Sequence, residues 1–322
     1  MVKMMEIPGK RAEAINRLLS LGSHAVPALV ATFDDPRQEV VLMALATVAS
    51  LGGVAAPALP DLKKLAQGED KVLARAASWA MHKMRPTGIT LLAEYSGGKI
   101  TRIDADGTVS EVKGLKGPFD VELLPNGNYL VAEFHKNRVC EINLEGKCVW
   151  EYPNLNEPLD VDALANGNTL VVERAGKRVI EVSRAGKIVW EFKHEGKRPQ
   201  DADRLANGNT LICFYTEGLL LEVDPKGKIV WKLTGYEMLS DADRLMNGNT
   251  LISTSGEKLV REVDPSGKTI LEIKIDDRLS DADRLPNGHT LVATNAAVVE
   301  FDALGQECWR RTAKYPGDVN RY

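Results

Sequence analysis

Six aspartates recur along the chain at intervals of 37 to 41 residues: Asp120, Asp160, Asp201, Asp241, Asp281 and Asp318. A second polar residue follows each of them two positions later, namely Glu122, Asp162, Asp203, Asp243, Asp283 or Asn320. If these segments are strands, the two residues of each pair lie on the same face. Carboxylates that converge in this way could hold a hard cation such as Ca²⁺ through oxygen ligands. Without a cation, their mutual repulsion would raise their pKa values.

The repetition itself favours a structural role for these aspartates. A residue present in every unit of a repeat is most simply explained by the architecture of the unit, because a ligand rarely needs six equal contacts. In that interpretation the carboxylates accept hydrogen bonds from backbone N–H groups of the preceding loop, or pair with Arg204, Arg244, Arg284 and Arg321. We favour the structural role and keep a Ca²⁺ site in a central channel as the alternative.

A second recurrent phrase shows what kind of element carries the aspartates. It reads NGNYL at 126–130, NGNTL at 166–170, 207–211 and 247–251, and NGHTL at 287–291, with a degenerate copy, TGITL, at 87–91. Asn-Gly between apolar runs is a strong β-hairpin signal, since both residues tolerate positive φ. A period near 40 residues with several short strands per unit is typical of a β-propeller.

Superposition of the repeats defines a unit of four strands, which we call a to d. Strand a carries the aspartate, the Asn-Gly hairpin joins a to b, and turns such as DPKG (224–227) and DPSG (264–267) join c to d. Strand d ends in Trp150, Trp190, Trp231 or Trp309. We expect these rings to pack one unit against the next.

The two ends of this region complete one unit. The last seven residues, PGDVNRY (316–322), align with the strand-a phrase PFDVELL (118–124), whereas PTGITLLAEY (86–95) aligns with the strand-b phrase PNGNYLVAEF (125–134). The C-terminal segment therefore supplies the strand a that the first unit lacks. Closure of this kind removes the open sheet edges of an array, and it predicts six blades.

The phrases DADRL…NGNTL and V-x-E-V-D followed by I-V-W resemble those of six-bladed propellers of the arylsulfotransferase-like, quinoprotein-like and NHL-like superfamily. The resemblance covers residues 87–322 and implies the fold. It implies no single chemistry, because propellers carry many unrelated functions.

The first 85 residues read as helices. Two phrases match at an offset of 30 residues, LGSHAVPAL at 21–29 and LGGVAAPAL at 51–59, and each places Gly at the end of one helix and Pro at the start of the next. Apolar spacing predicts helices near 9–21, 25–34, 37–51, 56–66 and 70–84. The pattern resembles short HEAT-like repeats of the phycobilisome-lyase type, which are found in many scaffold proteins. We expect two domains, residues 1–86 and 87–322, with the helices held against the propeller near the closing strand.

Function is expected where the repeat symmetry breaks. With strand a running from top to bottom, the b–c and d–a loops share the top face with the aspartates, and the uniform Asn-Gly hairpins mark the bottom. The top loops are variable, and half of this mouth is charged and aromatic, as a ligand or a peptide would need. The candidate ligand-binding residues are Glu94, Tyr95, Glu133, His135, Glu173, Arg174, Tyr215, His194 and Arg198.

The residues fit known propeller catalysis poorly. Sulfotransfer would need channel histidines, but His24 and His82 fall in the helical region and His289 in a bottom hairpin, which leaves His135 and His194 in top loops. A lactonase-like metal site would have to use Glu94, Glu133, Glu173 and Asn295. A quinone cofactor would need tryptophans stacked over the channel, whereas here they end the outer strands. We assign no catalytic residue and no cofactor.

Composition narrows the possible partners. The formal charge of −4 gives no sign of nucleic-acid or membrane binding. It divides into about +3 for residues 1–85 (11 basic, 8 acidic) and −7 for the remainder (30 basic, 37 acidic). The four cysteines show no metal-site spacing and read as buried thiols. A cytoplasmic monomer is the default expectation, although a chain from which an export signal had been removed would read the same.

Two function classes follow. The first, which we favour, is a non-catalytic binding or scaffold protein that recognises a protein or small ligand at the top of the propeller and through its helices. The alternative is a propeller enzyme, metal-dependent and hydrolase- or lactonase-like or else sulfotransferase-like, that uses carboxylates at the channel mouth.

Overall fold

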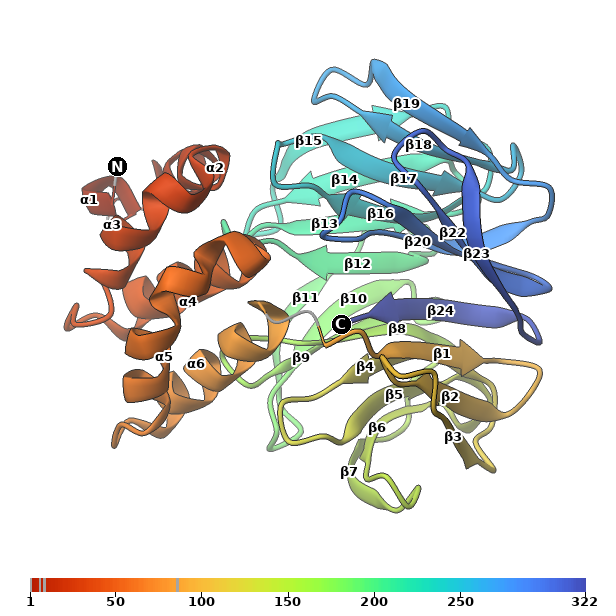
Figure 1. Ribbon diagram of the computed structural model, residues 1–322, viewed down its shortest axis with the longest axis horizontal. Helices are drawn as coiled ribbons and strands as arrows, with labels where there is room; N and C mark the ends of the chain where they lie inside the picture. The colour runs from red at the N-terminus through yellow and green to blue at the C-terminus, as the bar shows by residue number, and fades with distance from the viewer. Residues whose placement is uncertain (1, 6, 8–9, 85–86) are drawn as a thin grey trace.

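A computed structural model describes residues 2–5, 7, 10–84 and 87–322, and within these it shows a helical region followed by a β-propeller (Figure 1). The helical region contains α1 (Val2–Met5), α2 (Arg11–Ser20), α3 (Val26–Val30), α4 (Gln38–Ser50), α5 (Leu59–Ala66) and α6 (Lys71–Met84). The five predicted helices correspond to α2 to α6. Residue 9, where the first was predicted to begin, and Arg85 and Pro86 of the predicted linker lie outside the described residues.

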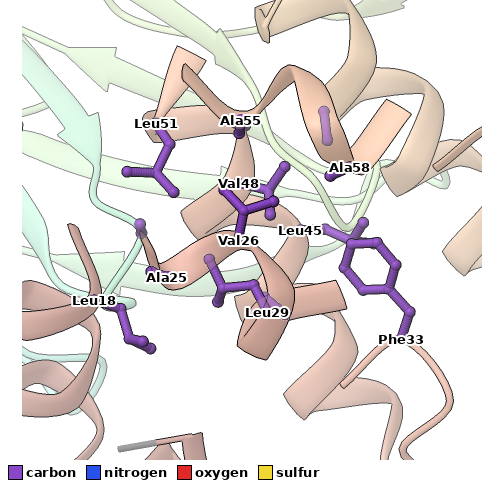
Figure 2. Close-up of a cluster of buried hydrophobic side chains, with 14 of the residues drawn as sticks. Leu18, Ala25, Val26, Leu29, Phe33, Leu45, Val48, Leu51, Ala55 and Ala58 are labelled. Carbon is purple, nitrogen blue, oxygen red and sulfur yellow. The ribbon is translucent and has the colours of Figure 1, made fainter. Parts of the chain in front are cut away.

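The two matching phrases adopt the same local structure. Each forms a 3₁₀ turn, η2 (Gly22–Ala25) or η3 (Gly52–Ala58), that leads into the helix after it. Both turns begin at a glycine with positive φ, 55° at Gly22 and 56° at Gly52, which glycine adopts without a Cβ penalty. The helices then bury small and branched apolar side chains against one another in a single core (Figure 2). These findings show a short helical region, and the HEAT-like grouping stays a prediction.

The propeller consists of six four-stranded antiparallel sheets. Blade 1 contains β24 (Pro316–Arg321), β1 (Thr90–Glu94), β2 (Lys99–Ile103) and β3 (Val109–Lys113); blade 2 contains β4 (Pro118–Leu123), β5 (Tyr129–Glu133), β6 (Arg138–Ile142) and β7 (Cys148–Tyr152); blade 3 contains β8 (Pro158–Ala163), β9 (Thr169–Glu173), β10 (Arg178–Val182) and β11 (Ile188–Phe192). Blade 4 contains β12 (Asp201–Arg204), β13 (Thr210–Phe214), β14 (Leu219–Val223) and β15 (Ile229–Thr234); blade 5 contains β16 (Leu239–Arg244), β17 (Thr250–Thr254), β18 (Leu259–Val263) and β19 (Thr269–Lys274); blade 6 contains β20 (Leu279–Arg284), β21 (Thr290–Thr294), β22 (Ala297–Phe301) and β23 (Glu307–Thr312). Their b strands are buried throughout and mainly apolar, which holds each blade between its neighbours.

The predicted ring closure is confirmed. Strand β24 pairs antiparallel with β1, from Thr90 opposite Arg321 to Ala93 opposite Asp318. The carbonyl of Tyr322 accepts a hydrogen bond from Thr87 N at 2.7 Å, and its hydroxyl accepts one from Leu123 N at 2.9 Å. The last residue of the chain is therefore bonded to blades 1 and 2 together.

The Asn-Gly hairpins differ from the prediction in their turn type. Among the hairpin residues only the glycine has positive φ, 84° at Gly127, while the preceding Asn126 does not. Leu124 N donates to Asn128 O at 2.8 Å, which closes a loop of three residues. This is a type I turn followed by a left-handed glycine, rather than the two-residue turn that Asn-Gly most often forms.

The tryptophans join neighbouring blades, as predicted. The indole N–H of Trp150 donates to the carbonyl of Arg184 at 3.0 Å, and that of Trp231 donates to Pro265 at 2.8 Å, each across a blade boundary. A guanidinium of the next blade lies over each ring, for example Arg244 at 4.4 Å from the centroid of Trp231. Such a cation–π contact adds roughly 0.5–1 kcal/mol at an exposed site.

The helical region docks on the bottom of the propeller, beside the closing strand (Figure 1). His82 of α6 lies with its ring 5.5 Å from that of Tyr322 and is 2.8 Å from the carbonyl of Leu123. Trp79 donates its indole N–H to Ala163 O at 2.9 Å, and Ala206 belongs to the helical core. The predicted position of the helices near the closing strand is thus confirmed, and it makes the bottom a docking face.

Candidate functional site

The six repeated aspartates form an upper ring of carboxylates on the innermost strands. Four of them accept a hydrogen bond from the backbone N–H of the next blade's innermost strand: Asp120 from Val161, Asp160 from Ala202, Asp241 from Ala282 and Asp281 from Val319, at 2.8 to 3.2 Å. The N–H donors thus come from the neighbouring strand, whereas we had placed them in the preceding loop. One oxygen of each of these aspartates is therefore committed to holding adjacent blades together.

The arginines that we had considered as partners of the aspartates bind elsewhere. Arg244 pairs with Glu222 at 2.9 Å, and Arg284 pairs with Glu262 at 3.0 Å, in both cases with a strand-c glutamate of the preceding blade. Because successive residues of a strand point to opposite faces, these arginines turn away from the channel that the aspartates line. Of the two structural alternatives, the backbone hydrogen bonds are therefore present and the pairing with Arg244 and Arg284 is not.

A lower ring follows two residues further down each strand, and the helical region reaches it with a cation. The Nζ of Lys83, near the end of α6, lies 2.6 Å from Oε1 of Glu122. Glu122 also accepts a hydrogen bond from Ala163 N at 2.6 Å. Although burial alone would lower it, the facing carboxylates of Glu122 and Asp162 raise the pKa of Lys83 above its ordinary value, so this side chain is charged in the channel.

Burial and mutual repulsion raise the pKa values of the channel carboxylates. Burial raises the pKa of Asp120 to about 6 and, together with the charge of Asp243, that of Asp203 to about 8. The pKa of Asp162 is also well above its usual value, chiefly through burial and the neighbouring Asp203, and Lys83 works against the rise. Ionised carboxylates in the channel therefore repel one another, and binding of a proton or a cation reduces this repulsion.

The three glutamates among the candidate top-face residues end their b strands and bind strand c, and two of them also bind a d–a loop. Glu133 is fully buried and accepts hydrogen bonds from Lys116 N at 2.9 Å and from Nε of Arg138 at 2.6 Å. Glu94 accepts from Thr101 and from Lys314 N, and Glu173 pairs with Arg178 at 2.5 Å. Because each of these carboxylates already has a partner within the fold, fewer of their oxygens remain free to bind a ligand than the sequence indicated.

Aromatic side chains gather at the top mouth over blades 1 and 2. The ring of Tyr95 lies 5.3 Å from His135 and 5.8 Å from each of Phe119, Phe134 and Tyr315. We call these five residues the aromatic cluster. Tyr315 is 41% exposed, and its φ of 49° lies in the left-handed region, which costs of order 1–3 kcal/mol and clusters at functional sites.

One charged pair stands near the aromatic cluster. The guanidinium of Arg174 lies 4.0 Å from Glu157, which also has positive φ, 55°. Burial raises the pKa of Tyr95, Glu157 adds to the rise and Arg174 opposes it, so these groups are within electrostatic reach of the ring. Of the nine candidate top-face residues, Tyr95 and His135 meet in the aromatic cluster, and Arg174 lies within electrostatic reach of Tyr95.

The remaining candidates belong to another part of the top face. His194 stacks on Phe192 and lies 5.7 Å from Phe214, in blades 3 and 4. Tyr215 lines a shallow depression with Tyr236, and Arg198 is exposed in the loop before β12. These residues do not join the aromatic cluster in one site.

A large cleft separates α2 from the bottom of blades 4 and 5. Its volume is about 1220 Å³. Arg11 and Asn16 line it from the helical side, and Asp203, Asp243 and Trp231 from the propeller side. The cleft thus opens onto the lower carboxylate ring.

Sequence reasoning missed both Lys83 and this cleft. The residue before each Asn-Gly could have indicated where the helices dock. It is alanine in two repeats, Ala165 and Ala206, and larger in the three others, Pro125, Met246 and Pro286. The two alanines pack against the helical core, so the small side chains mark where the helices dock.

Residues 88–245, a little under half of the chain, match a family model described as outer membrane protein assembly factor BamB. No curated protein gives a significant match. Among the described residues, no helix is long and apolar enough to cross a membrane.

Solved structures share the propeller. A Bacteroides caccae protein of unknown function is similar with a TM-score of 0.63 and 18% identity, over 72% of this chain and 97% of that chain. A virginiamycin B lyase from Staphylococcus aureus is similar with a TM-score of 0.52 and 14% identity, over 71% and 85%. The WD40 β-propeller domain of Doa1 is similar with a TM-score of 0.54 and 17% identity, over 64% and 72%. At these identities the likeness shows the fold, so the chain carries a six-bladed β-propeller whose first part matches the BamB-type repeat domain, preceded by a helical region.

Proposed function

We propose that this protein is a non-catalytic recognition protein that binds a polypeptide segment at the top mouth of its propeller. The observation that carries the proposal is the aromatic cluster, five rings contributed by the b–c loops of blades 1 and 2, by strand β4 and by the loop before β24. Tyrosine and arginine, with tryptophan, are enriched at the energetic centre of protein interfaces, and here Tyr95 packs against Tyr315 and lies within electrostatic reach of Arg174.

The fold supports this choice of face. The helical region already occupies the bottom, where Lys83 enters the channel. At the top, His135 and Tyr315 are exposed side chains held by packing on partly buried rings. A preorganised aromatic surface loses little conformational entropy when it binds. The description of the matching family as an assembly factor for outer membrane proteins is consistent with a polypeptide as the ligand.

A displayed peptide library tests this proposal. We expect the wild-type protein to enrich peptides that bind it, and Tyr315→Ala with His135→Ala to weaken their binding about tenfold or more, because a central aromatic contact contributes roughly 1–2 kcal/mol. Tyr236→Ala, on the same face in another blade, is the matched control and should leave the affinity unchanged. The proposal fails if the wild-type protein enriches no peptide over the naive library, or if the double variant binds the enriched peptides as tightly as the wild type does.

A second function is favoured by the cleft. Its floor carries Asp203, whose pKa of about 8 places it among the carboxyls suited to proton transfer near neutral pH. Carboxyls with perturbed pKa values in a large cavity are a common mark of an active site. We propose, as the alternative to recognition alone, hydrolysis of a small polar ester or lactone in this cleft.

A substrate panel decides this alternative. We expect aryl esters and lactones to be turned over with a pH profile that changes near pH 8, and Asp203→Asn to lower the rate at least about 100-fold, as expected for loss of a general acid or base. Asp224→Asn, at the rim of the same cleft, should keep the rate. If the wild type turns over none of these substrates, or if Asp203→Asn is as fast as the wild type, the hydrolase alternative is excluded. Neither result bears on the recognition proposal.

A further inference from the structure

Blade 6 departs from the other blades at two positions whose side chains meet near the bottom face. In four repeats an asparagine after the Asn-Gly pair donates its amide N–H to a strand-c glutamate at 2.6 to 2.7 Å; the pairs are Asn128 with Glu141, Asn168 with Glu181, Asn209 with Glu222 and Asn249 with Glu262. In blade 6 a histidine takes this place. Its Nδ1 lies 2.7 Å from Oε1 of Glu300.

The second departure lies on the neighbouring strand of the same blade. The residue before the tryptophan position of strand d is aliphatic in blades 2 to 5, which carry Val149, Val189, Val230 and Ile270, and is Ser110 in blade 1. In blade 6 it is Cys308. Its Sγ lies 3.7 Å from Nδ1 of His289. Imidazole, thiol and carboxylate thus have one ligand atom each within 4.8 Å of one another.

These three ligand types and their spacing suit one metal ion. Zn²⁺ is bound by Cys sulfur at about 2.3 Å, His nitrogen at about 2.0–2.1 Å and carboxylate oxygen at about 2.0–2.2 Å in a tetrahedron. Those bond lengths separate sulfur from nitrogen by about 3.5 Å, close to the 3.7 Å between Cys308 and His289. The distance from His289 Nδ1 to Glu300 Oε1, now 2.7 Å, has to lengthen by less than 1 Å as their hydrogen bond gives way to the metal, and Cys308 Sγ already lies within 4.8 Å of both.

The surroundings leave the three ligand atoms available. Cys308 is exposed, and the side chain of His289 is 29% exposed. Glu300 uses its other oxygen, Oε2, to bind Arg321 of the closing strand, so Oε1 can serve a metal while the ion pair persists. The arginine also orients the carboxylate from outside the ligand set, as such partners do in known metal sites.

We propose that His289, Glu300 and Cys308 form a binding site for a zinc-like divalent ion, with water as the fourth ligand. Binding takes the thiol proton of Cys308 to solvent, so one Zn–S bond forms as one S–H bond breaks; Glu300 is already ionised and His289 binds as the neutral ring. Because Glu300 also holds Arg321, the ion would brace blade 6 against the strand that closes the ring.

Two reversions to the residues of the other blades test the site. His289→Asn and Cys308→Val each restore what most other repeats carry, so we expect both variants to fold. We expect the untagged, reduced protein, stripped with chelator, to bind one Zn²⁺ per chain, to melt at a higher temperature with Zn²⁺, and to give thiolate-to-metal charge-transfer absorption with Co²⁺.

Each reversion should weaken Zn²⁺ binding more than about 100-fold, because even changes outside the ligand set cost up to about 100-fold. Cys148→Val, at a half-buried thiol in blade 2, is the matched control and should bind as the wild type does. The three-ligand site is overturned if the wild-type protein binds no Zn²⁺, or if His289→Asn or Cys308→Val binds Zn²⁺ with the wild-type affinity. A Co²⁺ complex without the charge-transfer absorption overturns the role of Cys308.

Discussion

Deletion of residues 316–322 is expected to abolish the cooperative unfolding transition of the propeller. The deleted segment is β24, the innermost strand of blade 1, whose neighbours around the channel are β4 and β20. Its loss strips hydrogen-bond partners from β1 and exposes a buried sheet edge that invites aggregation. The loss should exceed the net stability of a typical domain, on the order of 5–15 kcal/mol. Thermal melting followed by circular dichroism measures the outcome.

Two controls separate loss of the strand from loss of a single contact. Tyr322→Phe removes only the hydroxyl that accepts from Leu123 N, and should cost about 1 kcal/mol. A peptide of residues 314–322 added to the truncated chain should restore the transition in part, because an extended peptide can add to an open sheet edge. A truncated protein that melts as the full chain does would show that the ring closes in some other way.

Lys83→Met is expected to destabilise the protein by about 2–3 kcal/mol at pH 8, which is below the range for breaking a fully buried pair because the Lys83 side chain is 31% exposed. Methionine keeps the length of the side chain and removes its charge. Glu122 would lose its cation at 2.6 Å, and Asp162, Asp203 and their neighbours would lose the charge that lowers their pKa values.

The same variant should change how stability depends on pH. The folded-state pKa of Asp120, about 6, and that of Asp203, about 8, lie above the ordinary 3.8. The folded state therefore binds more protons than the unfolded state between pH 3.8 and these values, so the stability falls as pH rises through this window. For Asp120 alone the difference amounts to about 3 kcal/mol. Without Lys83 the decline should become steeper and extend to higher pH.

Melting temperatures from pH 5 to pH 9 check this prediction. We expect the difference between wild type and Lys83→Met to be smaller at pH 5, where the aspartates whose pKa values are raised are largely protonated, and largest above pH 8. Lys64→Met, an exposed lysine on α5, is the control and should follow the wild-type curve. A Lys83→Met curve parallel to that of the wild type would mean that Lys83 is not the counter-charge of the lower ring.

The candidate site was less predictable than the blades that carry it. The sequence correctly placed the aspartates in a ring, because a repeated position must occupy equivalent places in equivalent blades. Of the two kinds of partner that it offered, backbone N–H groups do bind the aspartates, from the neighbouring strand, whereas Arg244 and Arg284 bind glutamates one blade back. It also treated Glu94, Glu133 and Glu173 as open ligands, although Glu133 is fully buried by contacts that no local pattern reveals.

The sequence by itself determined the number of blades, the face on which the hairpins lie and the closure by the last seven residues. These follow from local chemistry, because a glycine with positive φ at each turn and the two-residue period of the strands act within one repeat. Three placements were decided only by the tertiary structure. Helix α6 places the side chain of Lys83 in the channel, Tyr95 contacts Tyr315 at the top mouth, and His289 contacts Cys308. Those contacts join residues 19 to 220 positions apart, and packing across blades and domains, rather than any periodic pattern, brings them together.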